Sequence, residues 1–130
     1  MARQELVFTV FPEKYAICRL DSRERIPEWA IGDNFFSVTR TPDELSVICP
    51  QERAPGETEC ERAFRLIRVA GPISLSVIGV VAAISRVIAN AGISLLTIST
   101  YETDYIMVKD KDLNAAIAAL TTEGWQVTVL

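Results

Sequence analysis

Two segments of the chain carry groups that could bind a small charged ligand. Glu102 and Asp104 lie in a polar turn and could receive an ammonium group, with the hydroxyl groups of Thr100 and Thr103 beside them. A second turn, 71–76, precedes an apolar pattern with helical spacing. The N-terminus of a helix offers unpaired N–H groups and partial positive charge, which suit a carboxylate. Together the two segments could hold a molecule that carries both charges.

Plainer interpretations of the same residues stay open. Thr, Glu and Asp are common in solvated hairpin turns. Gly71-Pro72 is typical of a simple turn, and Ser74 or Ser76 would be an ordinary N-cap for the helix that follows. Paired carboxylates can also form an acid–base couple, which is the enzyme alternative. The sequence offers that alternative no nucleophile, metal cage or phosphate-binding loop.

The composition excludes several kinds of chemistry. The 130-residue chain has no histidine, which excludes a Ser-His-Asp triad, a Cys-His dyad and histidine metal ligands. Its formal net charge is −4, and its arginines alternate with acids, which argues against a nucleic-acid partner. We therefore expect no enzyme activity, no catalytic or metal-ligating residue and no cofactor.

The cysteines indicate the expected cellular compartment. Cys18, Cys49 and Cys60 are far apart and form no C-x-x-C pair. Cys18 and Cys49 lie in apolar, strand-like runs, so we expect buried free thiols in a reducing environment. The first residues show no signal-peptide pattern. These features predict a cytoplasmic protein.

One long apolar stretch resembles a membrane span at first sight. Residues 69–101 contain a single charge, that of Arg86. Gly71-Pro72 breaks the stretch near its start, and Asn90-Ala91-Gly92 breaks it near its end. We expect a buried helix and a buried strand here, and no membrane partner.

The second half of the chain predicts a β-α-β-β-α-β order, the ferredoxin-like split βαβ arrangement. Its right-handed crossovers would place both helices on one face of an antiparallel sheet. Period-2 and helical apolar patterns give strands at 64–69, 93–99, 105–108 and 125–130, with helices at 76–90 and from Asp110 or Asp112 to about 120. In the helix at 76–90, five side chains are expected to face the sheet: Val77, Val80, Val81, Ile84 and Ile88.

The first half is interpreted as a degraded copy of the same unit. It predicts strands at 6–11, 15–20, 35–39 and 45–49, a turn at 12–14 and one helical turn at 27–30. A weak internal repeat places 37–48 over 97–108, with chance similarity of two hairpins as the alternative. We expect an α+β fold of two fused ferredoxin-like units, 1–61 (degenerate) and 62–130 (complete).

Three motifs in order resemble a known family. The run from Ile93 to Val108, with Ile98-Ser99-Thr100-Tyr101-Glu102-Thr103-Asp104, resembles the signature of a branch of ACT domains. Phe36 to Ser46 and Val69 to Ile73 resemble the other two hallmarks of that branch. It is a small tandem-ACT branch that resembles the CASTOR arginine sensors and aspartokinase regulatory domains.

The resemblance implies a function and a site. It implies an amino-acid-binding regulatory module, with ligand sites at unit or subunit interfaces, a homodimer and no catalysis. The ligand-binding residues it points to are Gly71, Pro72, Ile73, Leu75, Ser76, Thr100, Tyr101, Glu102, Thr103 and Asp104. The first half departs from the family because 15–20 is strand-like where a helix would lie. A pure interaction domain without a ligand therefore stays as the rival.

The helix at 76–90 gives a separate reason to expect a dimer. It is uncharged apart from Arg86 and has more apolar perimeter than one face of a sheet covers. Either a second copy or the first half of the same chain would cover the rest.

Overall fold

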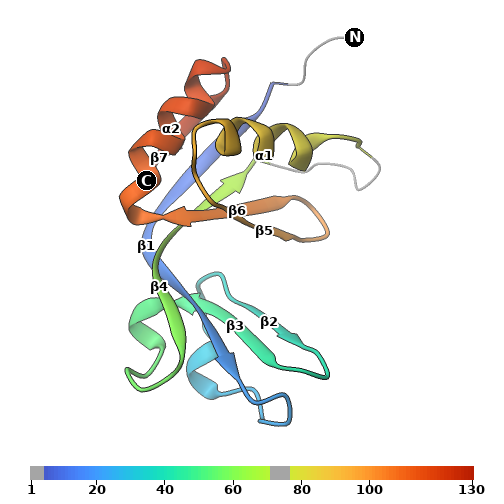
Figure 1. The fold of residues 1–130 in the computed structure, drawn as a ribbon, viewed down its shortest axis with the longest axis vertical. Coiled ribbons are helices and arrows are strands. Elements are labelled where there is room, and N and C mark those ends of the chain that lie inside the picture. Colours follow the sequence, from blue (N-terminus) through green and yellow to red (C-terminus); the bar gives the residue numbers. More distant parts are fainter. Residues whose placement is uncertain (1–4, 71–76) are drawn as a thin grey trace. The chain divides into compact units, whose positions relative to one another are not determined.

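A computed structural model describes residues 5–70 and 77–130. The chain divides into two compact units (Figure 1). The inner unit is Glu13–Phe64, and the discontinuous unit combines Met1–Pro12 with Arg65–Leu130. The boundaries fall inside two strands, β1 (Val7–Leu20) and β4 (Cys60–Val69). The first twelve residues therefore belong with the C-terminal half, whereas the sequence division ran from 1 to 61. That division into successive repeats stays a prediction.

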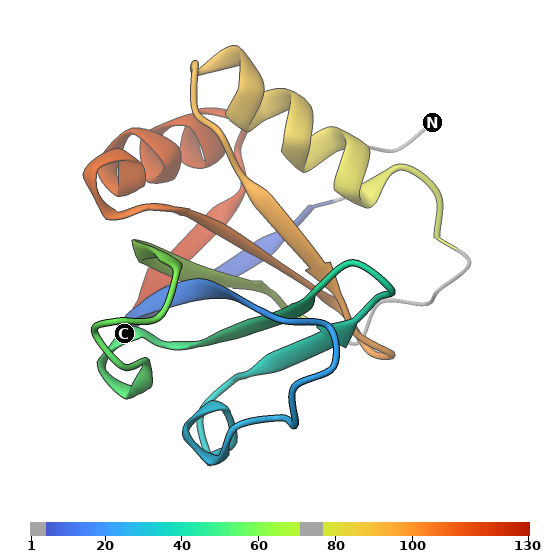
Figure 2. The same ribbon diagram turned by 60° about the horizontal axis from the view of Figure 1, so that its bottom comes forward.

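The discontinuous unit has the predicted β-α-β-β-α-β order. After β4 come α1 (Val80–Asn90), β5 (Leu96–Ser99), β6 (Asp104–Lys109), a 3-10 turn at Asp110–Asp112, α2 (Leu113–Thr122) and β7 (Gln126–Val129). Figures 1 and 2 show both helices on the same face of these strands. The core between them is apolar and includes Ile84, Ile88, Ala116 and Leu120.

The sheet of this unit differs from the expected antiparallel one at its last strand. Its order is β7-β1-β4-β6-β5. β7 pairs in parallel with β1, from Val7↔Gln126 to Val10↔Val129. The N-terminal strand thus lies between β7 and β4, and it completes the unit. Trp125 closes the core next to Phe8, with their ring centroids 5.8 Å apart.

Helix α1 begins later than predicted. Its N-cap is Gly79 with φ of 90°, a left-handed conformation that favours glycine, so the helix starts at Val80 rather than after Ser76. Val80, Ile84 and Ile88 face the core as predicted, and Val81 is partly buried. Val77 lies outside the helix and is 41 % exposed, so its predicted position against the sheet is wrong.

The inner unit is built on a hairpin. β2 (Ser37–Arg40) pairs with β3 (Leu45–Pro50), and β3 pairs with the second half of β1. Short 3-10 turns lie at Glu28–Ala30, where one helical turn was predicted, and at Gln51–Arg53. Its small core consists of Ala16, Cys18, Ala30, Val47, Cys49 and Ala54.

β1 is a single strand where two were predicted. Its edge pairs with β7 over Val7–Val10 and with β3 over Tyr15–Leu20. Pro12 has no backbone N–H to donate to a neighbouring strand. It lies between these two stretches, where no strand pairs with this edge of β1, so no hydrogen bond between strands is lost there. The proline that indicates a turn in the sequence is therefore compatible with a continuous strand.

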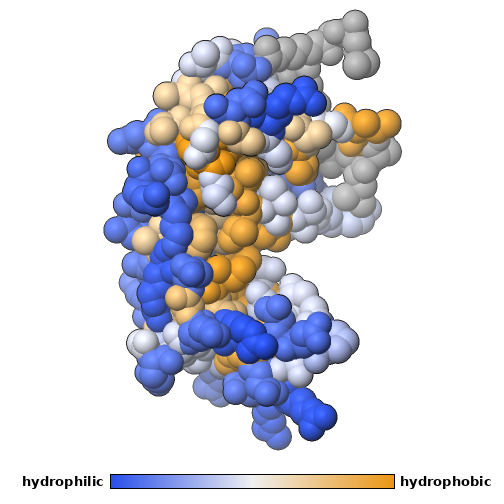
Figure 3. Space-filling view, in the orientation of Figure 1, coloured by the Kyte–Doolittle hydropathy of each residue, from blue (hydrophilic) through white to orange (hydrophobic). Residues whose placement is uncertain are grey.

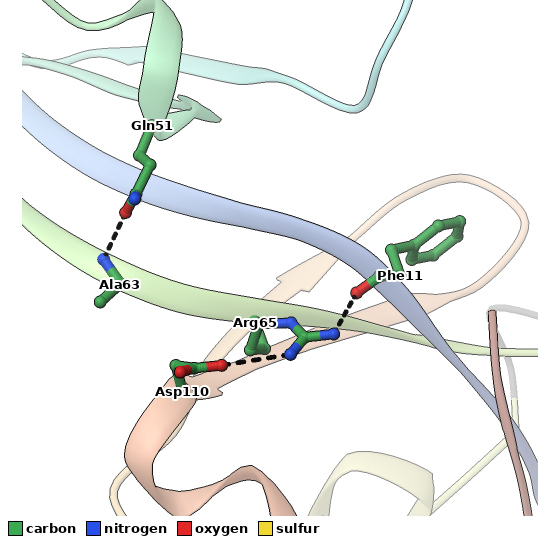
Figure 4. A network of polar contacts seen from close by, with 5 residues as sticks. All are labelled: Phe11, Gln51, Ala63, Arg65 and Asp110. Atoms are coloured by element: carbon green, nitrogen blue, oxygen red, sulfur yellow. Dashed lines mark hydrogen bonds and ion pairs between the residues drawn. The ribbon is translucent and has the colours of Figure 1, made fainter.

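Three hydrogen bonds involve β4 residues near the unit boundary (Figure 4). In the inner unit, the Ala63 N–H donates to the Gln51 side-chain oxygen at 2.8 Å, and Ala63 has a φ of 63°. In the discontinuous unit, the Arg65 guanidinium donates to Asp110 at 3.1 Å and to the Phe11 carbonyl at 2.9 Å. Within the described ranges, no helix has the length and apolar character needed to cross a membrane.

Candidate ligand-binding site

The turn between β5 and β6 contains half of the predicted site. The strands pair from Leu96↔Met107 to Ser99↔Asp104. The turn is closed by a hydrogen bond from the Thr100 N–H to the Thr103 carbonyl at 2.8 Å, and the Thr100 hydroxyl also donates to that carbonyl at 3.0 Å. The Thr103 N–H donates back to the Thr100 hydroxyl at 3.2 Å. The Thr100 side chain therefore shapes the turn.

Thr103 fixes this turn to β4. Its side chain is 5 % exposed, and its hydroxyl donates to the carbonyl of Val69, the last residue of β4. Val69 stands two positions before Gly71. The contact therefore holds the acidic turn beside the strand that leads into the other predicted segment.

The remaining polar groups of the turn are more open to solvent. The Asp104 carboxylate accepts a hydrogen bond from the Ser99 hydroxyl at 2.5 Å, which orients it at the start of β6. Glu102 is exposed, and Tyr101 is 84 % exposed. A carboxylate held by Ser99 and a second acid exposed two residues earlier can attract a cation.

The second predicted segment lies outside the described residues. It comprises Gly71, Pro72, Ile73, Leu75 and Ser76. Their assignment to the site stays a prediction. The first described residues after them, Val77 and Ile78, are 41 % and 96 % exposed. Figure 3 shows hydrophobic surface at this end of α1.

The hairpin of the inner unit repeats the turn of the candidate site. The Thr41 N–H donates to the Glu44 carbonyl at 2.9 Å, and the Glu44 N–H donates to the Thr41 hydroxyl at 3.1 Å. Thr41 thus corresponds to Thr100 and Glu44 to Thr103. The sequence comparison placed Thr41 opposite Tyr101, one residue away. The two hairpin turns close with the same hydrogen bonds, in a register that differs by one position from the sequence comparison, and such a shift exchanges the two faces of a strand. The internal repeat itself stays a prediction.

A pocket in the inner unit was not found from the sequence. It measures about 300 Å³ and is lined by Ile17, Cys18, Arg19, Glu44, Ser46, Glu59, Cys60 and Glu61. Cys18 and Cys60 are joined by a disulfide, so the expectation of a buried free thiol is wrong for Cys18. Their separation of 42 residues carried no pairing signal.

Cys49 is the free cysteine and is buried, as predicted. Burial raises the pKa of its thiol above the ordinary value of 9.0, and the charges of Arg53 and Arg62 partly offset this. Its thiol is therefore protonated and unreactive near neutral pH.

Comparison with known proteins identifies the family of the second half. The family model of the ACT domain matches residues 59–122. The chain contains an ACT domain. A second family model, for an N-terminal domain, matches residues 13–57. Residues 13–57 lie within the inner unit, whereas most of residues 59–122 lie in the discontinuous unit. Each unit is therefore matched by a family model of its own.

The chain is also similar to a curated protein and to a solved structure. The chain is 32 % identical over 100 residues to the cytosolic arginine sensor for mTORC1 subunit 1 of Bos taurus. The aligned region covers 68 % of this chain and 30 % of that protein. The chain thus spans about a third of that relative. An X-ray structure of a protein from Agobacterium tumefaciens has 28 % identity and a TM-score of 0.93, with coverage of 98 % and 96 %.

A third comparison supports the fold alone. The regulatory subunit of aspartate kinase from Thermus thermophilus has a TM-score of 0.59 at 10 % identity, with coverage of 84 % of this chain and 90 % of that one. The α+β, ferredoxin-like fold class and the likeness to aspartokinase regulatory domains are both confirmed.

Proposed function

We propose that this chain is a regulatory module that binds an amino acid at its ACT domain and that it has no catalytic activity. The ACT match over 59–122 supports a regulatory role. The arginine-sensor name of the relative supports an amino acid as ligand. Arginine is therefore the first ligand to test. The same name supports a cytoplasmic location.

The observation that carries the proposal is the contact between Thr103 and Val69. It holds the residue next to Asp104 beside the strand leading to Gly71. A carboxylate on one segment suits the ammonium group of an amino acid, and backbone N–H groups near Gly71 would suit its carboxylate. Binding that differs between two arrangements of the protein would then serve as the regulatory signal.

Asp104→Ala tests the site. We expect this variant to lose the stabilisation that a bound amino acid gives against thermal unfolding, while its ligand-free unfolding stays within about 0.5 kcal/mol of the wild type. Asp33→Ala, which removes an exposed acid of the inner unit, is the matched control and should keep the ligand effect. If Asp104→Ala and Asp104→Asn both unfold without ligand, Asp104 is structural and the site assignment is wrong.

We further propose a homodimer that involves the start of α1. Val77 and Ile78 are exposed there, and they are followed by a helix whose outer face carries the small residues Ala82 and Ala89. Sedimentation of the wild type should give twice 14.4 kDa. Ile78→Glu should shift the equilibrium to the monomer, and Asn114→Glu on α2 should not. A wild-type mass of 14.4 kDa up to about 100 μM would end the dimer hypothesis.

The rival proposal is an interaction domain of the same fold without a ligand. The hydroxyl groups of Thr100 and Thr103 favour it, because both are already used within the described fold. Its signature would be a dimer whose thermal unfolding responds to no amino acid.

A further inference from the structure

Cys18 and Cys60 are held opposite each other by the backbone of the inner unit. Their Cα atoms are 4.1 Å apart on neighbouring strands, nearest to the roughly 4.5 Å of directly opposed residues that exchange no backbone hydrogen bonds. The adjacent Arg19 N–H donates to the Glu59 carbonyl at 2.9 Å. Because strand pairing sets this distance, the two sulfur atoms stay neighbours after the bond between them is reduced.

The two cysteine residues differ in their exposure to solvent. Cys18 is 1 % exposed and belongs to the core of the inner unit, whereas Cys60 is only partly buried at the edge of that core. Both line the pocket of about 300 Å³. Thiol–disulfide exchange requires a thiolate to reach a sulfur atom, so access favours reaction at Cys60.

We propose that Cys18 and Cys60 are a reversible thiol–disulfide pair in which Cys60 exchanges with low-molecular-weight disulfides and thiols. In the oxidising direction, the Cys60 thiolate attacks a disulfide RSSR, forms a mixed disulfide and expels RS⁻. The Cys18 thiolate then attacks the Cys60 sulfur and expels the second RS⁻. The protein loses two electrons and two protons, and RSSR becomes two RSH. Reduction by two thiols reverses both steps.

The charges that line the pocket select among reagents. Glu44, Glu59 and Glu61 contribute three carboxylates and Arg19 one guanidinium, so the lining has a formal charge of −2 (−3 + 1). This charge attracts a cationic disulfide such as cystamine and repels the anionic glutathione disulfide. At the cytoplasmic location proposed above, a reversible pair is expected, because cytosolic disulfides are most often transient or redox-sensing.

Trapping variants test the assignment of Cys60. In the full chain with Cys49→Ala, we compare Cys18→Ala, which leaves Cys60, with Cys60→Ala, which leaves Cys18. Mixed-disulfide formation with cystamine is followed by mass spectrometry. We expect Cys60 to react at least about tenfold faster in the folded protein, and the two to react alike in urea. Equal rates in the folded protein would overturn the assignment.

The intact pair tests reversibility. With both cysteines present, excess cystamine should convert two maleimide-reactive thiols to none, and excess dithiothreitol should restore two. Cystamine should act faster than glutathione disulfide, and the difference should shrink with added salt. Two thiols that remain free after cystamine treatment would overturn the proposal. If Cys49→Ala does not fold, peptide mapping of the wild type gives the same readout.

Discussion

Removal of the Cys18–Cys60 disulfide should produce a large change in stability. The bond joins residues separated by 42 positions, and it closes a loop that contains β2, β3 and both 3-10 turns of the inner unit. The chain-entropy relation for a loop of that length gives about 4 kcal/mol of stabilisation at 25 °C. When the bond is reduced, the unfolded chain gains conformational entropy, whereas strand pairing keeps the two cysteines together in the folded state.

Urea unfolding measures this difference. In the Cys49→Ala background, we expect the oxidised protein to exceed the reduced one by about 4 kcal/mol in the free energy of unfolding. Cys60→Ala should resemble the reduced protein and should not respond to dithiothreitol. A difference below about 1 kcal/mol would refute the loop argument. An equal response of Cys60→Ala to dithiothreitol would show that the reagent acts elsewhere.

Three further predictions concern single residues. Thr103→Val should destabilise the protein by about 1–2 kcal/mol in urea unfolding, because it removes a buried hydrogen bond to Val69 at nearly constant shape; an unchanged midpoint would show that the contact is not an anchor. Ala63→Gly should stabilise by about 0.5 kcal/mol, because a φ of 63° strains alanine. Ala54→Gly is the control: Ala54 has an ordinary φ of −73°, so glycine there should destabilise the protein by about 0.5–1 kcal/mol. Equal effects of Ala63→Gly and Ala54→Gly on the free energy of unfolding would contradict the strain argument. Burial raises the pKa of Cys49, so above pH 9.0 the folded state keeps a proton that the unfolded chain loses. Stability should therefore fall as pH rises past 9.0, more in the wild type than in Cys49→Ala, and parallel curves would refute the pKa shift.

The elements of the C-terminal half could be predicted because their signals are local. Ile84 and Ile88 recur at helical spacing, and both proved buried on α1. A turn was predicted from Thr100 to Asp104 between two apolar runs, and the structure has one there that ends at Thr103, because Asp104 already pairs with Ser99. The start of α1 was missed because Ser76 is a better N-cap by type than Gly79, which acts through its backbone conformation.

The features that were missed depend on contacts between distant residues. The local preference of Pro12 indicates a break in the strand. In the structure β1 continues through Pro12, because its edge pairs with β7 before the proline and with β3 after it. This change of neighbouring strand cannot be predicted from local sequence. The pairing of Cys18 with Cys60 requires the register of β1 against β4. The pocket that these cysteines line has the same origin, since its residues come from three separate segments.

Thermal unfolding of the wild-type chain with each of the twenty amino acids tests the central claim most directly. A ligand in hundredfold excess over its Kd stabilises the folded state by about 2.7 kcal/mol, which gives a shift of several degrees in a domain of this size. We expect such a shift with arginine or with a small set of amino acids, and its loss in Asp104→Ala but not in Asp33→Ala. The absence of a shift with all twenty at millimolar concentration would contradict amino-acid binding.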